Sequence, residues 1–140
     1  MGMTHYMRRP EELAADAFAR AAADCRKLLK DFQPALTGFE RGDAPQFHEQ
    51  AIIFNGGCEP LNVRRVHHDL RGRPEFFIYC KTERLPYDQA VKMAMIVLKH
   101  HLGDAVHVTS DADDGEWESA RLAVQERLGY GGDFKLDGKT

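Results

Sequence analysis

The clearest pattern along the chain is a strand, a short loop, a buried helix and a second strand between residues 75 and 111. Residues 75–81 (EFFIYCK) are apolar on both faces, which is typical of a strand in the centre of a sheet with layers above and below. Residues 86–102 are apolar over most of a helical circumference, so they predict a buried helix with Gly103 as its C-terminal cap. Residues 105–109 predict the strand that follows.

The chain before residue 75 predicts one helix and two strands. Apolar residues recur every three or four positions over 10–32, with Pro10 in the first turn and Pro34 beyond the end. After a loop over 34–48, residues 50–54 and 61–68 predict strands. The turn at 69–74 indicates that the second of these strands forms an antiparallel hairpin with 75–81.

The chain after residue 109 predicts a final helix. Asp113 or Asp114 is placed to cap its N-terminus. Its apolar stripe is Trp117, Ala120, Val124 and Leu128. The element order α-β-β-β-α-β-α therefore predicts an α+β (mixed α/β) fold in three layers, with a four-stranded mixed sheet, one β-hairpin and one right-handed βαβ crossover. We expect a single globular domain over 10–132, between flexible tails at 1–9 and 133–140.

Composition and charge narrow the classes of partner. The 140 residues are 43% hydrophobic and 29% charged, with a formal net charge of −3. No global basic field exists, so nucleic acid is not the expected partner. Arg64, Arg65, Arg71 and Arg73 form a local basic cluster, which a solvated hairpin would also explain. No apolar run approaches the ~20 residues of a membrane span, and the three cysteines contain no CxxC pair, so we expect reduced thiols, a cytoplasmic location and no membrane partner.

Two parallel strands joined by a buried helix place their C-terminal ends at one edge of the sheet, where ligands collect. The N-terminus of the helix carries a partial positive charge, and Lys81 and Arg84 add full charges. We therefore expect a small anionic ligand, or a protein partner, at this edge. The residues expected to contact it are Lys81, Thr82, Arg84, Tyr87, Asp88, Ser110, Asp111 and Trp117. The structural alternative is that Asp88 and Asp113 cap helices while Lys81 and Arg84 pair with Asp111.

No catalytic residue is assigned, because the chain contains no nucleophile elbow, phosphate-binding loop or zinc-protease motif. No cofactor is expected, although a divalent metal could bind Asp111 and Asp113. His100 and His101 are weaker candidates, because neighbouring side chains on a helix point about 100° apart. Cys80 lies inside a strand and is interpreted as a small inert hydrophobic residue.

Four segments resemble a group of small proteins from bacterial and phage genomes to which no activity is assigned. They are CEPLNVRRV, CKTERLPYD, LKHHLGD and TSDADDGEW. The element order is also similar to the core of the PD-(D/E)xK nucleases, which bind a divalent metal with an acid on one strand and an acid-x-lysine on the next. Asp69 and Lys81 would match that pattern, but Tyr79 stands where the family has its second acid. This departure removes the metal-binding pair.

Two functions from different classes follow. The first is a non-enzymatic bacterial or phage accessory protein that binds an anion or a partner at the strand ends. The alternative is a metal-dependent hydrolase of phosphodiesters. Aromatic residues in predicted loops and tails could also cover a homodimer surface; they are Tyr6, Phe39, Phe47 and Tyr130.

Overall fold

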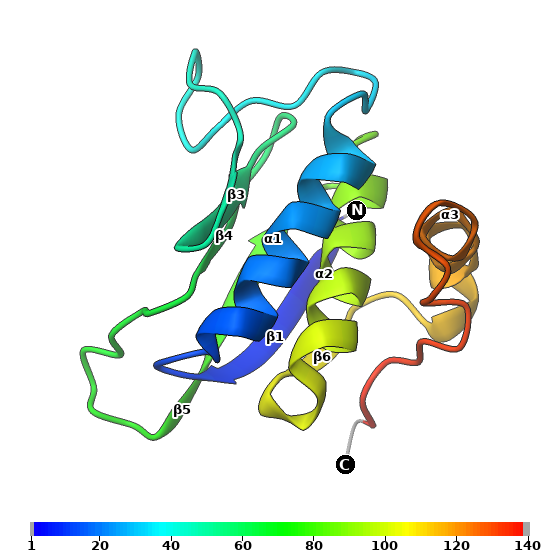
Figure 1. Ribbon diagram of the computed structural model, residues 1–140. Helices are drawn as coiled ribbons and strands as arrows, with labels where there is room; N and C mark the ends of the chain where they lie inside the picture. Colours follow the sequence, from blue (N-terminus) through cyan, green and yellow to red (C-terminus); the bar gives the residue numbers. More distant parts are fainter. Residues whose placement is uncertain (1, 139–140) are drawn as a thin grey trace.

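A computed structural model describes residues 2–138, which contain three α-helices and two three-stranded antiparallel sheets (Figure 1). The α+β class is therefore confirmed. The strands are β1 (Thr4–Pro10), β2 (Gln46–His48), β3 (Ala51–Phe54), β4 (Leu61–Arg64), β5 (Glu75–Lys81) and β6 (His107–Ser110). The α-helices are α1 (Ala15–Leu29), α2 (Asp88–Leu102) and α3 (Glu118–Leu128), with short 3₁₀ turns η1 (Gly103–Ala105) and η2 (Asp114–Trp117). None of the described helices is long and apolar enough to cross a membrane.

The strand β1 is the centre of the first sheet, whose order is β5-β1-β6. The expectation of a flexible tail at 1–9 is therefore wrong for residues 4–9, and Pro10 ends a strand instead of starting a helix. The pattern was missed because two of the inward positions, His5 and Arg9, carry polar side chains that are nevertheless fully buried. The outermost residues of the two predicted tails, 1 and 139–140, lie outside the described residues.

The strands β5 and β6 both run antiparallel to β1, so they are parallel to each other but are not neighbours. Lys81 at the end of β5 pairs with Thr4, and Ser110 at the end of β6 pairs with His5. The expected meeting of the segments near 82 and 110 at one edge of the sheet is therefore confirmed. The expectation that the two strands lie side by side is wrong, because β1 occupies the place between them.

The second sheet has the order β2-β3-β4, so the predicted single four-stranded sheet is wrong. The predicted hairpin between 61–68 and 75–81 is also wrong, because β4 pairs with β3 and β5 pairs with β1. Arg9 joins the two sheets at the far end of β1. Its buried guanidinium donates hydrogen bonds to the backbone carbonyls of Pro10, Glu11, Arg64 and Arg65. Burial lowers the pKa of Arg9 to about 10.

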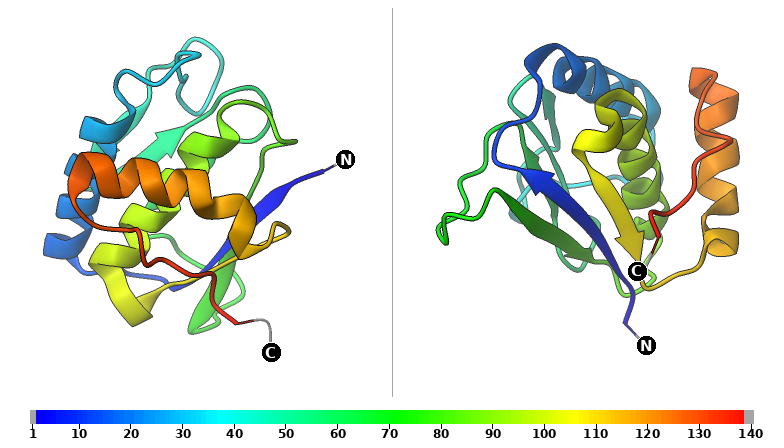
Figure 2. Two further views of the ribbon diagram at one scale, coloured as in Figure 1. Left: turned by 90° about the vertical axis from the view of Figure 1, so that its right-hand side faces the viewer. Right: turned by 90° about the horizontal axis from the view of Figure 1, so that it is seen from below.

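The helices α1 and α2 lie on one side of the sheet β5-β1-β6, and no described helix covers the other side (Figure 2). The helix α2 is buried as predicted, and Gly103 ends it in a left-handed conformation with φ +56°. The expectation that β5 lies between two layers is wrong. Phe76 and Cys80 face the core, whereas Phe77 and Tyr79 on the other face are 56% and 64% exposed.

The chain after α3 folds back onto the protein. Phe134 is buried and stacks on Trp117 with 5.2 Å between ring centroids. The Asp137 backbone N–H donates to the carbonyl of Val108, and its carboxylate accepts from the Val108 N–H. The expectation of a flexible C-terminal tail is therefore wrong for residues 134–137, which are anchored to η2 and β6.

Substitutions in β1 test whether residues 4–10 form a central strand of the core or a flexible tail. Met7 is 0% exposed, so Met7→Ala should lower the free energy of unfolding by about 2–5 kcal/mol, the range for emptying a core position. The neighbouring Arg8→Ala is the matched control, because Arg8 is exposed and loses only a surface ion pair with Glu75, worth about 1 kcal/mol or less. Denaturant unfolding measures both; equal, small effects would mean that β1 does not belong to the core.

Candidate functional site

The two cations expected to bind an anion, Lys81 and Arg84, are each paired with a carboxylate of the protein. Lys81 Nζ lies 3.1 Å from a Glu83 carboxylate oxygen, and Arg84 Nη1 lies 2.8 Å from Glu116 Oε1. The structural alternative is therefore right that both cations form ion pairs, but their partners are Glu83 and Glu116 and not Asp111. These ion pairs neutralise the loop that precedes α2, which reduces its attraction for an external anion.

Beneath this loop lies a buried network of hydrogen bonds, here called the His5 network. His5 Nε2 is 2.7 Å from Asp88 Oδ1, and His5 Nδ1 is 2.8 Å from Ser110 Oγ. Thr82 Oγ1 donates to Asp88 Oδ1, and Lys92 Nζ lies 2.9 Å from Asp88 Oδ2. All five residues are at most 9% exposed. The network joins β1, β5, β6 and α2 at the edge of the sheet where the sequence predicts a site.

The carboxylate of Asp88 is the centre of the network. Burial by itself raises the pKa of a carboxyl group, but the hydrogen bonds from His5, Thr82 and Lys92 outweigh it and hold the pKa of Asp88 well below its ordinary value. Asp88 is thus an ionised group whose charge is balanced locally by Lys92. Contrary to the capping interpretation, its side chain makes no cap hydrogen bond to α2.

The line Ser110–His5–Asp88 has the residue types of a nucleophilic triad. With a proton on Nε2 shared with Asp88, His5 Nδ1 can accept the hydroxyl proton of Ser110. However, Ser110 is 2% exposed and its Oγ already accepts the backbone N–H of Ala112. His5 is 0% exposed. The hydroxyl and the imidazole are therefore both buried, and the three residues connect β1, β6 and α2.

The remaining predicted contact residues also have partners within the fold. Tyr87 is 2% exposed, and its hydroxyl donates to the carbonyl of Glu59. Asp111 accepts the backbone N–H of Thr4 and the hydroxyl of Tyr6. Trp117 is fully buried with its ring edge-on to His5 at 5.1 Å, and its indole N–H has no hydrogen-bond partner among the described residues.

The metal candidates lie at opposite ends of α2. Asp113 forms a capping box with Glu116 at the start of η2, as the capping interpretation predicts. His101 Nε2 contacts Asp24 Oδ2 at 2.8 Å, and His100 stacks on Tyr130 at the C-terminal end of α2. Within residues 2–138, no three His, Cys, Asp or Glu side chains gather closely enough to bind one ion. Burial also raises the pKa of Cys80 to about 12, which fits its interpretation as inert.

A second surface, which the sequence analysis missed, lies on the uncovered side of the sheet and is here called the open face. Register places Tyr6 of β1 directly opposite Tyr79 of β5, and Arg8 opposite Phe77. The alternating burial along each strand assigns these residues to the outer side. The open face comprises Thr4, Tyr6, Arg8, Glu75, Phe77, Tyr79, Lys81, His107 and Thr109. The apolar residues on both faces of 75–81 could have indicated this surface, since such a strand either is central or exposes one apolar face.

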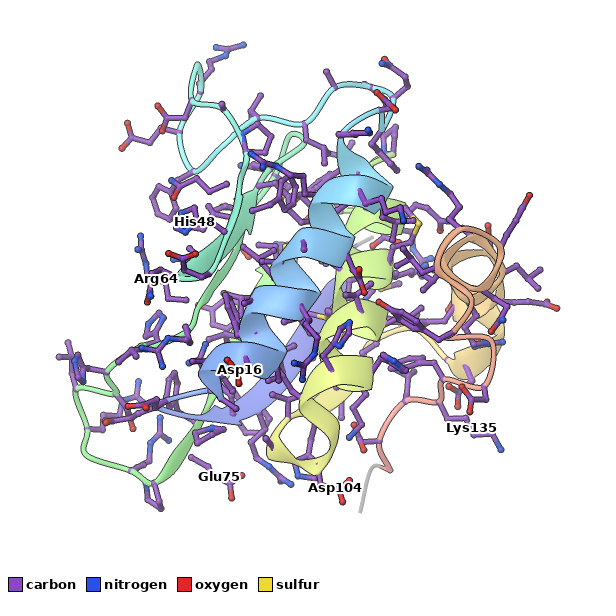
Figure 3. All side chains as sticks on the ribbon, in the orientation of Figure 1. Asp16, His48, Arg64, Glu75, Asp104 and Lys135 are labelled. Carbon is purple, nitrogen blue, oxygen red and sulfur yellow. The ribbon has the colours of Figure 1, made fainter. Side chains whose placement is uncertain are left out.

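A pocket of about 290 Å³ adjoins the open face at Phe77. It is lined by β5 and by the turn before it, including His67, His68, Arg71 and Arg73. Figure 3 shows Arg64 and Glu75 on either side of this projecting turn. The Nδ1 atom of His67 is buried and has no hydrogen-bond partner among the described residues. The pocket thus combines aromatic rings with Arg71 and with Arg73, which is paired with Asp69 of the same lining.

Comparison with known proteins gives no relative: no family model, no curated protein and no solved structure matches this chain.

Removal of the Asp88 charge tests the His5 network. Asp88→Asn leaves Lys92 without its buried partner, so we expect a loss of roughly 3–5 kcal/mol in the free energy of unfolding at pH 7. Because the folded pKa of Asp88 is depressed, the wild-type advantage is full above the ordinary carboxyl pKa, begins to fall below about pH 4 and decreases further as pH approaches the depressed folded pKa.

Glu83→Gln is the matched control, because it removes the carboxylate of an exposed ion pair worth about 1 kcal/mol or less. Denaturant unfolding from pH 7 to pH 3 measures both variants. An Asp88→Asn protein as stable as the control at pH 7, or a deficit that does not shrink in acid, would contradict the assigned role of Asp88.

Proposed function

We propose that this protein is a non-enzymatic binding module whose ligand lies on the open face of the sheet β5-β1-β6. The observation that carries the proposal is the exposure of Phe77 and Tyr79, at 56% and 64%, on a side that no described helix covers. Exposed aromatic side chains at neighbouring positions are costly to solvate, and such patches mark interaction sites. Aromatic rings offer flat surfaces on which planar groups of a ligand stack.

The edge at 81–88 and 110–117 is a less favourable place for the ligand. Its cations are satisfied by Glu83 and Glu116, and its interior is filled by the His5 network. A small anion there would have to replace existing ion pairs. The proposal therefore keeps the predicted class, a binding module, and moves the ligand from the strand ends to the outer surface of the same strands.

The metal-dependent hydrolase remains the alternative, but no specific observation favours it. The carboxylate of Asp88 interacts with Lys92 and His5, and that of Asp113 accepts the backbone N–H of Glu116 in a capping box. Asp69 accepts two backbone N–H groups of its own turn and pairs with Arg73. The acidic residues that such a hydrolase would need are thus separated and already hydrogen-bonded.

Substitution on the open face should change binding without changing stability. Phe77→Thr and Tyr79→Thr keep the preference for a strand and remove the rings, so the free energy of unfolding should change by about 1 kcal/mol or less. Uncharged planar compounds, adenosine and N-acetyltryptophanamide, serve as ligands in backbone-amide NMR titrations. In the wild-type protein they should shift signals of residues 4–8, 75–81 and 107–110, and these shifts should weaken in both variants.

Leu122→Ala is the control variant, because Leu122 is 60% exposed on α3, away from the sheet. It should leave the titrations unchanged. A large loss of stability in Phe77→Thr would show that the ring supports the fold. Shifts confined to other surfaces, or none at all, would refute the open face as a binding site.

A further inference from the structure

We propose that the ligand of the open face is a single-stranded nucleic acid; this inference rests on the proposed function and specifies its ligand class. The first support is the spacing of the rings. Tyr6 and Tyr79 are direct cross-strand partners, so their Cβ atoms lie about 5 Å apart, and Phe77 follows two residues along the same face at about 7 Å. Exposed aromatic rings at such intervals on a sheet are platforms for stacking successive unpaired bases.

The second support is a concentration of arginines at one end of the platform, here called the arginine end. Residues 8–12 and 64–75 contain six arginines and four carboxylates, a local charge of +2 in a chain of net charge −3. The fold creates this concentration, because Arg9 on β1 binds the backbone of Arg64 and Arg65 through its guanidinium. The formal net charge of −3 does not reveal this concentration, because β1 reaches the arginine cluster only in the folded protein.

The arginine end offers positions for phosphate groups next to the rings. Arg8 lies beside Phe77 in the sheet, and Arg71 and Arg73 line the pocket that adjoins Phe77. Arg64 and Arg71 have no carboxylate within ion-pair distance in the described part of the chain, unlike Arg8, Arg65 and Arg73. Arg71, which lines the pocket at Phe77, is thus available for a phosphate without breaking an existing pair.

The shape of the open face favours single strands over duplexes. The rings project from the surface of a sheet, and in a duplex the bases are stacked on each other with only their edges accessible. A duplex would therefore contact the arginines alone. An acidic peptide would likewise use the arginines and leave Tyr6, Phe77 and Tyr79 without stacking partners.

A second copy of the chain fits the open face less well. Two strands of seven residues and one of four, at about 3.3 Å per residue and about 4.8 Å between strands, cover on the order of 300 Å². A stable protein–protein interface needs about 800 Å² on each partner. The open face is therefore small for a homodimer interface and large enough for about two or three stacked bases.

The experiment is a fluorescence anisotropy titration at low salt, about 50 mM, with labelled oligonucleotides of about ten residues. The ligands are single-stranded oligouridylate, the matching deoxythymidylate, a DNA duplex of the same length and polyglutamate. We expect both single strands to bind about tenfold or more tightly than the duplex and polyglutamate. The RNA and DNA arms show whether the 2′-hydroxyl contributes.

Four variants separate the contributions of the aromatic rings and of the arginines to binding of the oligonucleotides. Phe77→Thr and Tyr79→Thr should each weaken single-strand binding about tenfold, whereas Leu122→Ala should not change it. Arg71→Ala should weaken binding to every strand alike and reduce its dependence on salt. The midpoint of thermal unfolding, measured for each variant, verifies that it is folded before its binding is compared.

Equal binding of single strands, duplex and polyglutamate would overturn the inference, since charge alone would explain it. Absence of oligonucleotide binding together with NMR shifts on the open face from the planar compounds would overturn the ligand class and leave the binding module standing. Absence of both would overturn the two proposals together. Concentration-dependent dimerisation that Phe77→Thr abolishes would also overturn the inference, because it would assign the face to a second copy.

Discussion

The structure depends on the insertion of β1 between β5 and β6. Every backbone partner of these two strands in the first sheet comes from residues 4–10, so the sheet cannot form without the N-terminal segment. The inward side chains of β1 are His5, Met7 and Arg9, and each is fully buried. Met7 packs in the apolar core, whereas His5 and Arg9 must find hydrogen-bond partners before they can be buried. Those partners come from elements far away in the sequence.

The two buried polar residues of β1 join this strand to other elements at its two ends. At one end His5 contacts Ser110 of β6 and Asp88 of α2. At the other end Arg9 binds the backbone carbonyls of Arg64, the last residue of β4, and of Arg65 after it, which holds the second sheet against the first. Both ring nitrogens of His5 and four of the five N–H groups of the Arg9 guanidinium make hydrogen bonds, so removing a partner is costly. The inner side of the sheet therefore maintains the fold, whereas Phe77 and Tyr79 on the outer side are exposed.

Local sequence signals predicted β5, α2, β6 and the caps at Gly103 and Asp113, because periodicity and capping depend on neighbouring residues. The strand β1 could not be found this way. Its buried positions carry histidine and arginine, whose burial depends on partners about 55 to 105 residues away. The candidate site was likewise predicted only in part. The chain does bring Lys81 and Ser110 to one edge, but the pairing of Lys81 with Glu83 and of Arg84 with Glu116 depends on side-chain geometry that spacing alone does not decide.

The same placement of β1 makes the distribution of charged residues uneven along the open face, with carboxylates at one end and arginines at the other. Glu83 and Asp111 lie near Thr4 at the start of β1, whereas Arg8 and the arginines of residues 64–73 lie at its end. Because Lys81 neutralises Glu83, the charge that remains at the start of β1 is that of Asp111, and a polyanion would be attracted mainly to the arginine end, within about a Debye length of it. Tyr6, Tyr79 and Phe77 lie between the two ends. In the proposed complex, phosphates held at the arginine end would bring the first unpaired bases onto the rings and limit the contact to a few nucleotides, so a negative net charge of the chain does not conflict with a short, local site for a polyanion.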